Sequence, residues 1–258
     1  MWSGGLFIVL ALGINSVALS AEQVATQATA PAMSEVVTDL SGTYWATEYH
    51  AKLQPLGGGE PPLNDAGKAA YEMNRAGLRD KSLDDPVRTY CLPDGIPRLL
   101  STPYPFQLYQ LPPGQVTFVH ELNNQVRVVP LNVELPTDEQ ILVAPTYEGY
   151  TTGHYEGGVL VIRGKGFNDQ TFLDSSGLPH SDKLETTERV RRIGNQLEDI
   201  VTIHDPEYYG KDWQVRFVYE RRPGLRLQEY VCGEPHRDIS HIKGIREIRE
   251  QRAKGLFP

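Results

Sequence analysis

Glu188 is the side chain of this sequence best placed for acid–base chemistry. Alternate residues of the segment 183–191 share one face of a predicted strand, namely Leu184, Thr186, Glu188 and Val190. That face is largely apolar, and a carboxylate buried on it without a partner would have a shifted pKa and could serve as an acid or a base. The alternative is that Glu188 pairs with an arginine of a neighbouring strand at the rim of a barrel.

Three other segments carry ionisable side chains that could act on a ligand. His154 and Glu156 lie two residues apart on a predicted strand and therefore point the same way, which places an imidazole and a carboxylate within reach of one ligand. His180 lies in the loop 175–182, whose glycine and proline place it where barrel mouths present ligand contacts. Asp205, held extended by the proline that follows it, is interpreted chiefly as a turn former.

A metal site is a weaker interpretation of the histidines. His154, His180 and His204 could converge on a divalent metal if the fold brought them to one end of a barrel. The sequence contains no C-x-x-C, C-x-x-C-H or H-E-x-x-H motif, so we expect neither a metal nor a cofactor.

Short alternating segments separated by turn residues dominate the chain from residue 115 onward and predict antiparallel hairpins. A first strand is expected over 41–50. An ordered loop with short edge strands is expected over 90–113, where prolines recur. The predicted strand pairs are 115–121 with 125–129, 154–156 with 159–162, 183–191 with 197–204, and 213–221 with 225–231.

Two helices are predicted beside these strands. Asn64 can cap a short helix over 64–77. A second helix is predicted over 238–254, where four isoleucines three residues apart form one apolar stripe. We expect this C-terminal helix to pack against the outside of the sheet, with binding to a membrane surface as the alternative.

Together these elements predict the fold class. Six or more consecutive antiparallel strands with apolar residues on both faces are expected to curl, because closing the sheet removes its unpaired edges. We therefore predict a mainly β single domain over 41–258, an antiparallel meander that closes into a lipocalin-like β-barrel. A two-sheet sandwich is the alternative.

The N-terminus indicates export. The apolar run 6–14, followed by a small-x-small site at 18–20, predicts a signal peptide over 1–20 and then a disordered linker over 21–40. A retained anchor is the alternative, but the run is shorter than the ~20 residues that span a bilayer. We therefore expect a periplasmic or secreted protein with no stable membrane insertion after cleavage.

The cysteines and the charge fit such a location. Cys91 and Cys232 are the only two cysteines and are expected to form a disulfide in an oxidising compartment, with two buried thiols as the alternative. The net charge of -8 argues against a nucleic-acid partner.

Several short motifs between residues 41 and 234 belong together. They include Cys91-Leu-Pro-Asp-Gly-Ile-Pro-Arg98, Gly153-His-Tyr-Glu-Gly-Gly-Val-Leu-Val-Ile162, Gly177-Leu-Pro-His-Ser181 and Glu188-Arg189. The combination resembles a family of exported bacterial proteins of uncharacterised function, whose members carry a Trp-Glu-Gly-Asp-Thr-Leu-Val-Val block, a Gly-x-Pro-His-Ser loop and a Glu-Arg strand. Here Tyr155 stands in place of the tryptophan and Gly158-Val159 in place of Asp-Thr. The resemblance implies a periplasmic β-rich protein and no particular activity.

The first functional hypothesis is an exported barrel that binds a small apolar or aromatic molecule in its interior. Tyr155, His180, Glu188 and Arg189 are then expected near the mouth, and Asp205 is a further candidate ligand contact.

The second hypothesis is a cofactor-free lyase, isomerase or hydrolase on the same barrel. Glu188 or Glu156 would act as acid or base with His154 or His180 as its partner. A structural or assembly component of the cell envelope is a third hypothesis.

Overall fold

The computed structural model describes residues 39–232, together with Met1 and Lys254. The predicted signal peptide, the linker up to residue 38 and the C-terminal helix before Lys254 lie outside the described residues. The described part contains nine β-strands, three α-helices and two short 3-10 helices. None of the described helices is long and apolar enough to cross a membrane.

The nine strands form one antiparallel sheet. Their bounds are β1 (Gly42–Ala46), β2 (Phe106–Tyr109), β3 (Gln115–His120), β4 (Val126–Pro130), β5 (Tyr150–Glu156), β6 (Val159–Lys165), β7 (Glu185–Ile193), β8 (Gln196–His204) and β9 (Trp213–Arg221). The order across the sheet is β4-β3-β2-β1-β9-β8-β7-β6-β5. Strands consecutive in sequence are therefore neighbours, apart from β4 and β5 at the two ends of this order, and β1 pairs with the distant β9. This arrangement confirms the predicted mainly β antiparallel meander.

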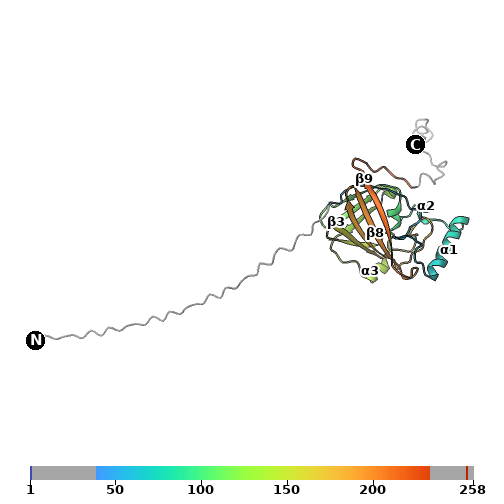
Figure 1. Cartoon of the computed structure of the whole chain (residues 1–258), viewed down its shortest axis with the longest axis horizontal. Helices are drawn as coiled ribbons and strands as arrows, with labels where there is room; N and C mark the ends of the chain where they lie inside the picture. The colour runs from blue at the N-terminus through green and yellow to red at the C-terminus, as the bar shows by residue number, and fades with distance from the viewer. Residues whose placement is uncertain (2–38, 233–253, 255–258) are drawn as a thin grey trace. The chain divides into compact units, whose positions relative to one another are not determined.

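The two outermost strands, β4 and β5, nearly close the sheet into a barrel (Figure 1). Neighbouring strands alternate in direction, so the two edge strands of a nine-stranded sheet, here β4 and β5, run the same way and can meet only in parallel. An isolated parallel bridge joins Leu131 to Gly153, and the Asn132 N–H donates to the Gly153 carbonyl at 2.8 Å. A Cβ at position 153 would lie 3.0 Å from Leu131 Cδ2, so a glycine favours this close approach. The lipocalin-like barrel predicted from the sequence is confirmed as a nearly closed meander.

The predicted first helix is confirmed and is slightly longer than expected. Helix α1 (Asp65–Asp80) begins after Asn64, whose side chain accepts a hydrogen bond from the Gly67 N–H at 2.9 Å. It lies on the outside of the barrel (Figure 1), where the Tyr71 hydroxyl is 2.7 Å from Ser176 Oγ. The shorter helices were not predicted; they are α2 (Pro86–Tyr90), η1 (Arg98–Ser101), η2 (Leu122–Asn124) and α3 (Asp138–Val143).

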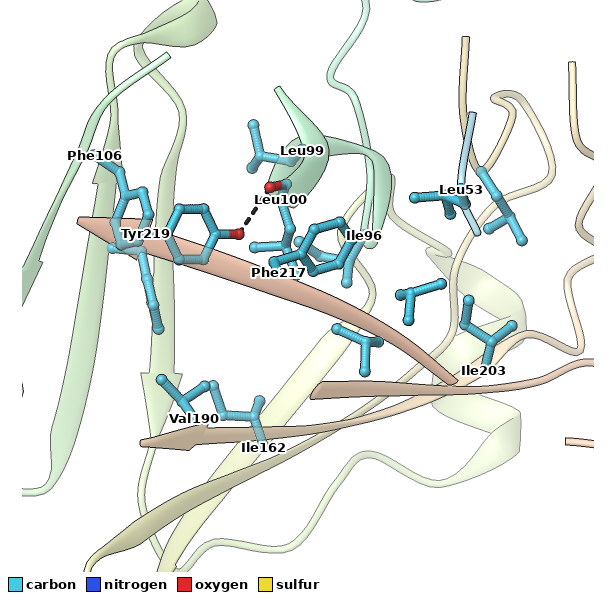
Figure 2. Packing of buried hydrophobic residues seen from close by; sticks show 14 of the residues in the cluster. Leu53, Ile96, Leu99, Leu100, Phe106, Ile162, Val190, Ile203, Phe217 and Tyr219 are labelled. Atoms are coloured by element: carbon cyan, nitrogen blue, oxygen red, sulfur yellow. Dashed lines mark hydrogen bonds between the residues drawn. The ribbon is translucent and has the colours of Figure 1, made fainter. Parts of the chain in front are cut away.

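Inward-facing side chains of the strands pack against the loop that contains η1. In Figure 2, Phe217 and Tyr219 of β9 lie beside Leu99 and Leu100 of η1. The Tyr219 hydroxyl donates to the Leu100 carbonyl at 2.7 Å, and all four residues belong to one continuous hydrophobic core. The loop therefore behaves as a plug that is part of the core.

Two strand predictions are wrong. The segment 225–231, predicted to pair with β9, contains no strand. The position beside β9 is taken by β1, with Trp45 opposite Glu220. Strand β2, predicted as a short edge strand within 90–113, lies between β1 and β3. Local turn signals could not reveal that the first strand would insert between two distant parts of the chain.

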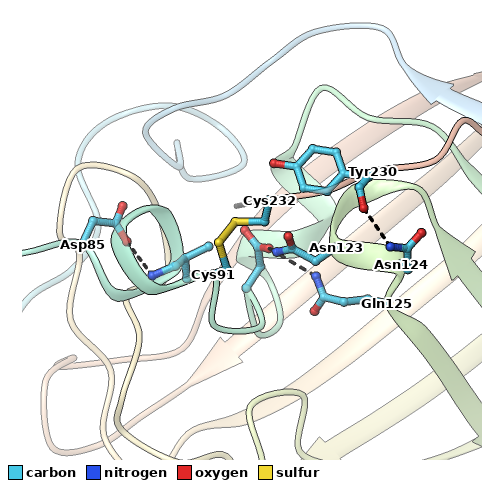
Figure 3. The surroundings of a disulfide bond; sticks show 9 residues. Asp85, Cys91, Asn123, Asn124, Gln125, Tyr230 and Cys232 are labelled. Atoms are coloured by element: carbon cyan, nitrogen blue, oxygen red, sulfur yellow. Dashed lines mark hydrogen bonds between the residues drawn. A yellow bond between two sulfur atoms is a disulfide. The ribbon is translucent and has the colours of Figure 1, made fainter. Parts of the chain in front are cut away.

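The predicted disulfide is confirmed. Cys91 and Cys232 are joined with an S–S distance of 2.08 Å across 141 positions of sequence (Figure 3). The bond ties the chain between α2 and the plug to the last residues of the continuous described stretch. A compartment that permits disulfides is consistent with this pairing.

Candidate functional site

A group of ionisable side chains lies inside the barrel. Strand alternation points His120 of β3, Arg127 of β4, Glu188 of β7 and Asp199 of β8 inward, and each is at most 4% exposed. We call these four residues the interior cluster. Burying charges is costly unless they are paired, so the partners of each member determine what the cluster can do.

Arg127 and Glu188 form a buried ion pair across the barrel. Arg127 Nη1 donates to Glu188 Oε2 at 2.8 Å, and Nη2 donates to Oε1 at 2.5 Å, which is the two-bond geometry preferred by arginine and carboxylate. Burial lowers the pKa of Arg127, but the neighbouring Glu188 carboxylate outweighs it, so the pKa is raised overall. The structure thus pairs Glu188 with an arginine, but across the buried interior rather than from a neighbouring strand at the rim as the sequence alternative had it.

Asp199 shares a hydrogen bond with Glu188. Burial raises the pKa of Asp199 well above its usual value, and the negative charge of Glu188 raises it further. The raised pKa favours the protonated form of Asp199, in which its carboxyl donates to Glu188. With Asp199 protonated, the Arg127–Glu188 ion pair leaves the trio without net charge.

His120 is the fourth member and carries no charge at neutral pH. Burial, reinforced by the positive charge of Arg127, lowers the pKa of His120 to about 3. Its ring lies 5.2 Å from that of Phe106, and the Arg127 guanidinium lies 5.6 Å from the centre of the Phe118 ring. The polar groups of the cluster therefore lie against aromatic walls.

Three atoms of the interior cluster lack a hydrogen-bond partner among the residues that the structure describes. They are His120 Nε2, Arg127 Nε and Asp199 Oδ1, all of which are buried. Leaving a buried polar group unpaired costs about 1–3 kcal/mol, so three such atoms in one group call for a molecule that satisfies them.

A second buried network lies in the plug, next to the disulfide. Arg98 donates two hydrogen bonds to Asp85, at 3.0 and 2.6 Å, and its Nε lies 3.6 Å from Asp94. Asp94 also accepts from Gln125 at 3.2 Å and from Asn123 at 3.4 Å (Figure 3). Burial raises the pKa of Asp94 to about 6, although Arg98 opposes the shift.

Glu148 lies between the plug network and the interior cluster. Burial raises its pKa; the Arg127 charge lowers it, and the Asp94 and Glu188 charges raise it. Its side chain therefore feels charges from both networks. Unlike the members of the interior cluster, Glu148 is only partly buried.

His154, Glu156 and Arg189 form a separate group on the outer surface. His154 Nε2 lies 2.9 Å from Glu156 Oε1, and Arg189 Nη1 donates to Glu156 Oε2 at 2.9 Å. These two contacts hold the pKa of Glu156 below its usual value. Arg189 and Glu188 are consecutive on β7 and face opposite sides of the sheet, so the structure does not bring this group to Glu188.

The other predicted site residues are held by contacts within the fold. Asp205 accepts from the Ser181 N–H at 2.7 Å and from the Ser181 hydroxyl at 2.8 Å, in agreement with its interpretation as a turn former. His180 is buried, with Nε2 3.1 Å from the Thr171 hydroxyl, and burial lowers its pKa. Tyr155 is buried, and its hydroxyl accepts from Gln110 Nε2 at 2.6 Å.

The three histidines considered for a metal do not converge. His204 contacts Asp212 at 2.6 Å, whereas His154 and His180 have the different partners described above. Within the described part of the chain, no three His, Cys, Asp or Glu side chains are arranged to hold a metal ion.

Pockets are present on the outer surface, away from the interior cluster. One pocket of about 630 Å³ lies beside α3 and is lined by residues that include Ile141, Leu142 and Phe167. Another of about 480 Å³ includes His154 and Arg163. In the pocket beside α3, Lys165 pairs with Asp138 at 2.8 Å and Lys183 with Asp182 at 3.0 Å, so both lysines already have partners. Among the described residues, three of the seven unpartnered buried side-chain atoms belong to the interior cluster, more than any other group of contacting residues holds, which makes this cluster the better candidate site.

Comparison with known proteins adds no assignment. No protein-family model matches the chain, and no curated protein sequence matches it. The argument for function therefore depends on the geometry of the interior cluster.

Sequence reasoning found Glu188 but missed its three partners. Asp199 shares an alternating strand face with Leu197 and Val201, and Arg127 shares one with Val129. This is the same signal that identified Glu188, namely a charge on an otherwise apolar strand face. Applied to every strand, it would have found Asp199 and Arg127 as well.

Proposed function

We propose that the protein is an exported barrel that binds a small molecule at the interior cluster. The observation that carries this proposal is the set of three unpartnered buried atoms around the Arg127–Glu188 ion pair. The fold and the disulfide are compatible with an exported binding protein. The ligand would approach the cluster from the side of Glu148, which is only partly buried.

The chemistry of the cluster defines the ligand's polar group. Arg127 Nε–H needs an acceptor. Asp199 Oδ1 needs a donor, because its other oxygen bonds Glu188. The ion pair is already balanced, so an added charge would be buried without compensation. A neutral group that both donates and accepts, such as a hydroxyl or an amide, meets these conditions.

The walls of the site define the rest of the ligand. Phe106 and Phe118 lie beside His120 and Arg127, and Phe106 also meets Tyr219 edge-on with ring centres 4.9 Å apart. Such surroundings favour an apolar or aromatic body. The proposed ligand is thus a small aromatic or apolar molecule with one neutral polar group.

The test is to purify the full chain from its own host and analyse it by native mass spectrometry before and after extraction with organic solvent. Wild type is expected to release one molecule of the proposed class. The variant Arg127→Met/Glu188→Leu, which removes both charges together, is expected to release at least tenfold less.

Glu185→Gln is the matched control, because Glu185 lies on the same strand as Glu188 and faces solvent. It should keep the molecule. Wild-type protein that carries no molecule, or a double variant that carries as much as wild type, would overturn the binding proposal.

A second candidate function is acid–base catalysis without a cofactor. It is favoured by one observation: the Asp199 carboxyl is hydrogen-bonded to Glu188 beside Arg127. Asp199 would donate a proton and Glu188 would accept one, as in an isomerase or lyase. This pair takes the place of the Glu/His pair predicted from the sequence.

Asp199→Asn separates the two functions, because an amide keeps a donor toward Glu188 and removes the transferable proton. If the protein is a catalyst, wild type should exchange deuterium from heavy water into a carbon of the captured molecule, and Asp199→Asn should not. Equal exchange in both proteins would exclude Asp199 as the proton donor, and no exchange in either would leave binding as the function.

A further inference from the structure

The outer surface of the barrel is divided by charge. None of the described outward-facing residues of β1 to β4 carries a charge, and the most exposed of them are Trp45, Tyr109, Val126 and Val128. We call this surface the uncharged face. The outer side of β6 to β9, by contrast, carries many charged side chains, including Arg163, Arg189, Arg191 and Arg216. An exposed apolar area next to such a charged one marks an interaction surface.

The last part of the continuous described stretch is fixed beside the uncharged face. Asn124, in the turn between β3 and β4, donates to the Tyr230 carbonyl at 2.9 Å (Figure 3). Glu121 accepts from the Gln228 N–H at 2.7 Å. The rings of Tyr230 and Tyr104 meet edge-on at 5.2 Å, and Cys232 is held by the disulfide. The chain therefore reaches residue 232 close to the start of β4.

The sequence that follows has the composition to cover an apolar surface. Residues 238–254 contain Ile239, Ile242, Ile245 and Ile248 among charged residues, the pattern of a helix with one apolar stripe. A helix of this length would be about 25 Å long. Four strands at ~4.8 Å spacing and four to six residues each form a face of comparable size. The segment 233–237 can span up to ~17 Å, enough to bring the helix onto this face.

We propose that residues 238–254 dock as a helix on the uncharged face, with the isoleucine stripe against Val126, Val128 and Tyr109. This placement is independent of the proposed function. The tether at Cys232 favours the chain's own segment over other occupants, because it keeps the segment at high local concentration next to the face. A second copy of the chain and a membrane surface are the other occupants that the experiment distinguishes.

The experiment is photo-cross-linking in the full chain. Ile245 is replaced by p-benzoylphenylalanine, and Glu247, on the opposite side of the predicted helix, is replaced in a matched control. After irradiation, Ile245-labelled protein is expected to cross-link within one chain to peptides covering 107–128. The control at position 247 is expected to give at least fivefold less of that product.

Val128→Asp tests the receiving surface, and Thr202→Asp on β8 is its control. Val128→Asp should reduce the cross-link at least fivefold, and Thr202→Asp should leave it unchanged. Three results would overturn the proposal: no cross-link, a product of twice the chain mass, or a product formed only with vesicles of anionic phospholipid.

Discussion

Replacing Asp199 by asparagine is expected to change how stability depends on pH. Asp199 is buried, and its pKa is raised above the value of about 3.9 that an aspartate has in an unfolded chain. Between that value and the raised folded value, the unfolded state loses a proton that the folded state keeps. Stability of the wild type therefore falls as pH rises through this interval, and the asparagine variant is free of that loss.

The size of the effect follows from linkage. Each pH unit in the interval corresponds to roughly 1 kcal/mol of differential stability. The free energy of unfolding of Asp199→Asn, minus that of wild type, should thus rise with this slope from about pH 4 up to the raised pKa of folded Asp199. Asparagine keeps a hydrogen-bond donor toward Glu188, so the fold should be preserved.

Urea unfolding of both proteins at several pH values between 4 and 8 measures this difference, with the disulfide kept intact. Asp169→Asn is the control, because Asp169 is exposed and its difference curve should be flat within about 0.5 kcal/mol. A flat curve for Asp199→Asn, or one that falls with pH, would show that Asp199 is ionised in the folded protein, and the shared proton would have to be abandoned.

Three further predictions concern the buried networks and the disulfide. Glu188→Gln leaves Arg127 with a weaker partner and should lower the free energy of unfolding by about 2–4 kcal/mol. Arg127→Met/Glu188→Leu removes both charges and should lower it by less. Urea unfolding that ranked the two variants in the opposite order would contradict the buried ion pair. Asp94→Asn should gain roughly 2–3 kcal/mol relative to wild type between pH 4 and pH 7, because the Asp94 pKa of about 6 makes the wild type lose stability over that interval; a difference independent of pH in the same assay would refute this. Replacing both Cys91 and Cys232 by alanine should cost about 4 kcal/mol and lower the thermal midpoint, and an unchanged midpoint in calorimetry would show that the bond does not constrain the unfolded chain.

The strands were predictable wherever a hairpin is local. The turn at Asn123 and Asn124 lies between β3 and β4 as expected, and both residues adopt the left-handed conformation that asparagine tolerates. The strand 225–231 was wrongly predicted because a turn signal shows only that the chain reverses. It does not show whether the place beside β9 is already occupied by β1.

The candidate site was predictable only in part for the same reason. Alternation showed that Glu188 faces inward and that Arg189 faces outward, a property of the strand itself. That Arg127 is its partner depends on the curvature of a nine-stranded sheet, which brings β4 across the interior from β7. His154 and Glu156 do contact each other, but local spacing could not show that their side of β5 is the solvent side.

The sequence by itself determined the period-two patterns, the cap at Asn64 and the inward direction of Glu188, because each depends on neighbours a few residues away. It also contained the two cysteines whose pairing an oxidising compartment permits. Only the tertiary structure decided that β1 joins β9, that the loop around η1 packs into the core, and that Arg127, Glu188 and Asp199 meet. Those contacts are set by packing between residues far apart in the chain, where the energy of burying a charge depends on a partner that local sequence does not specify.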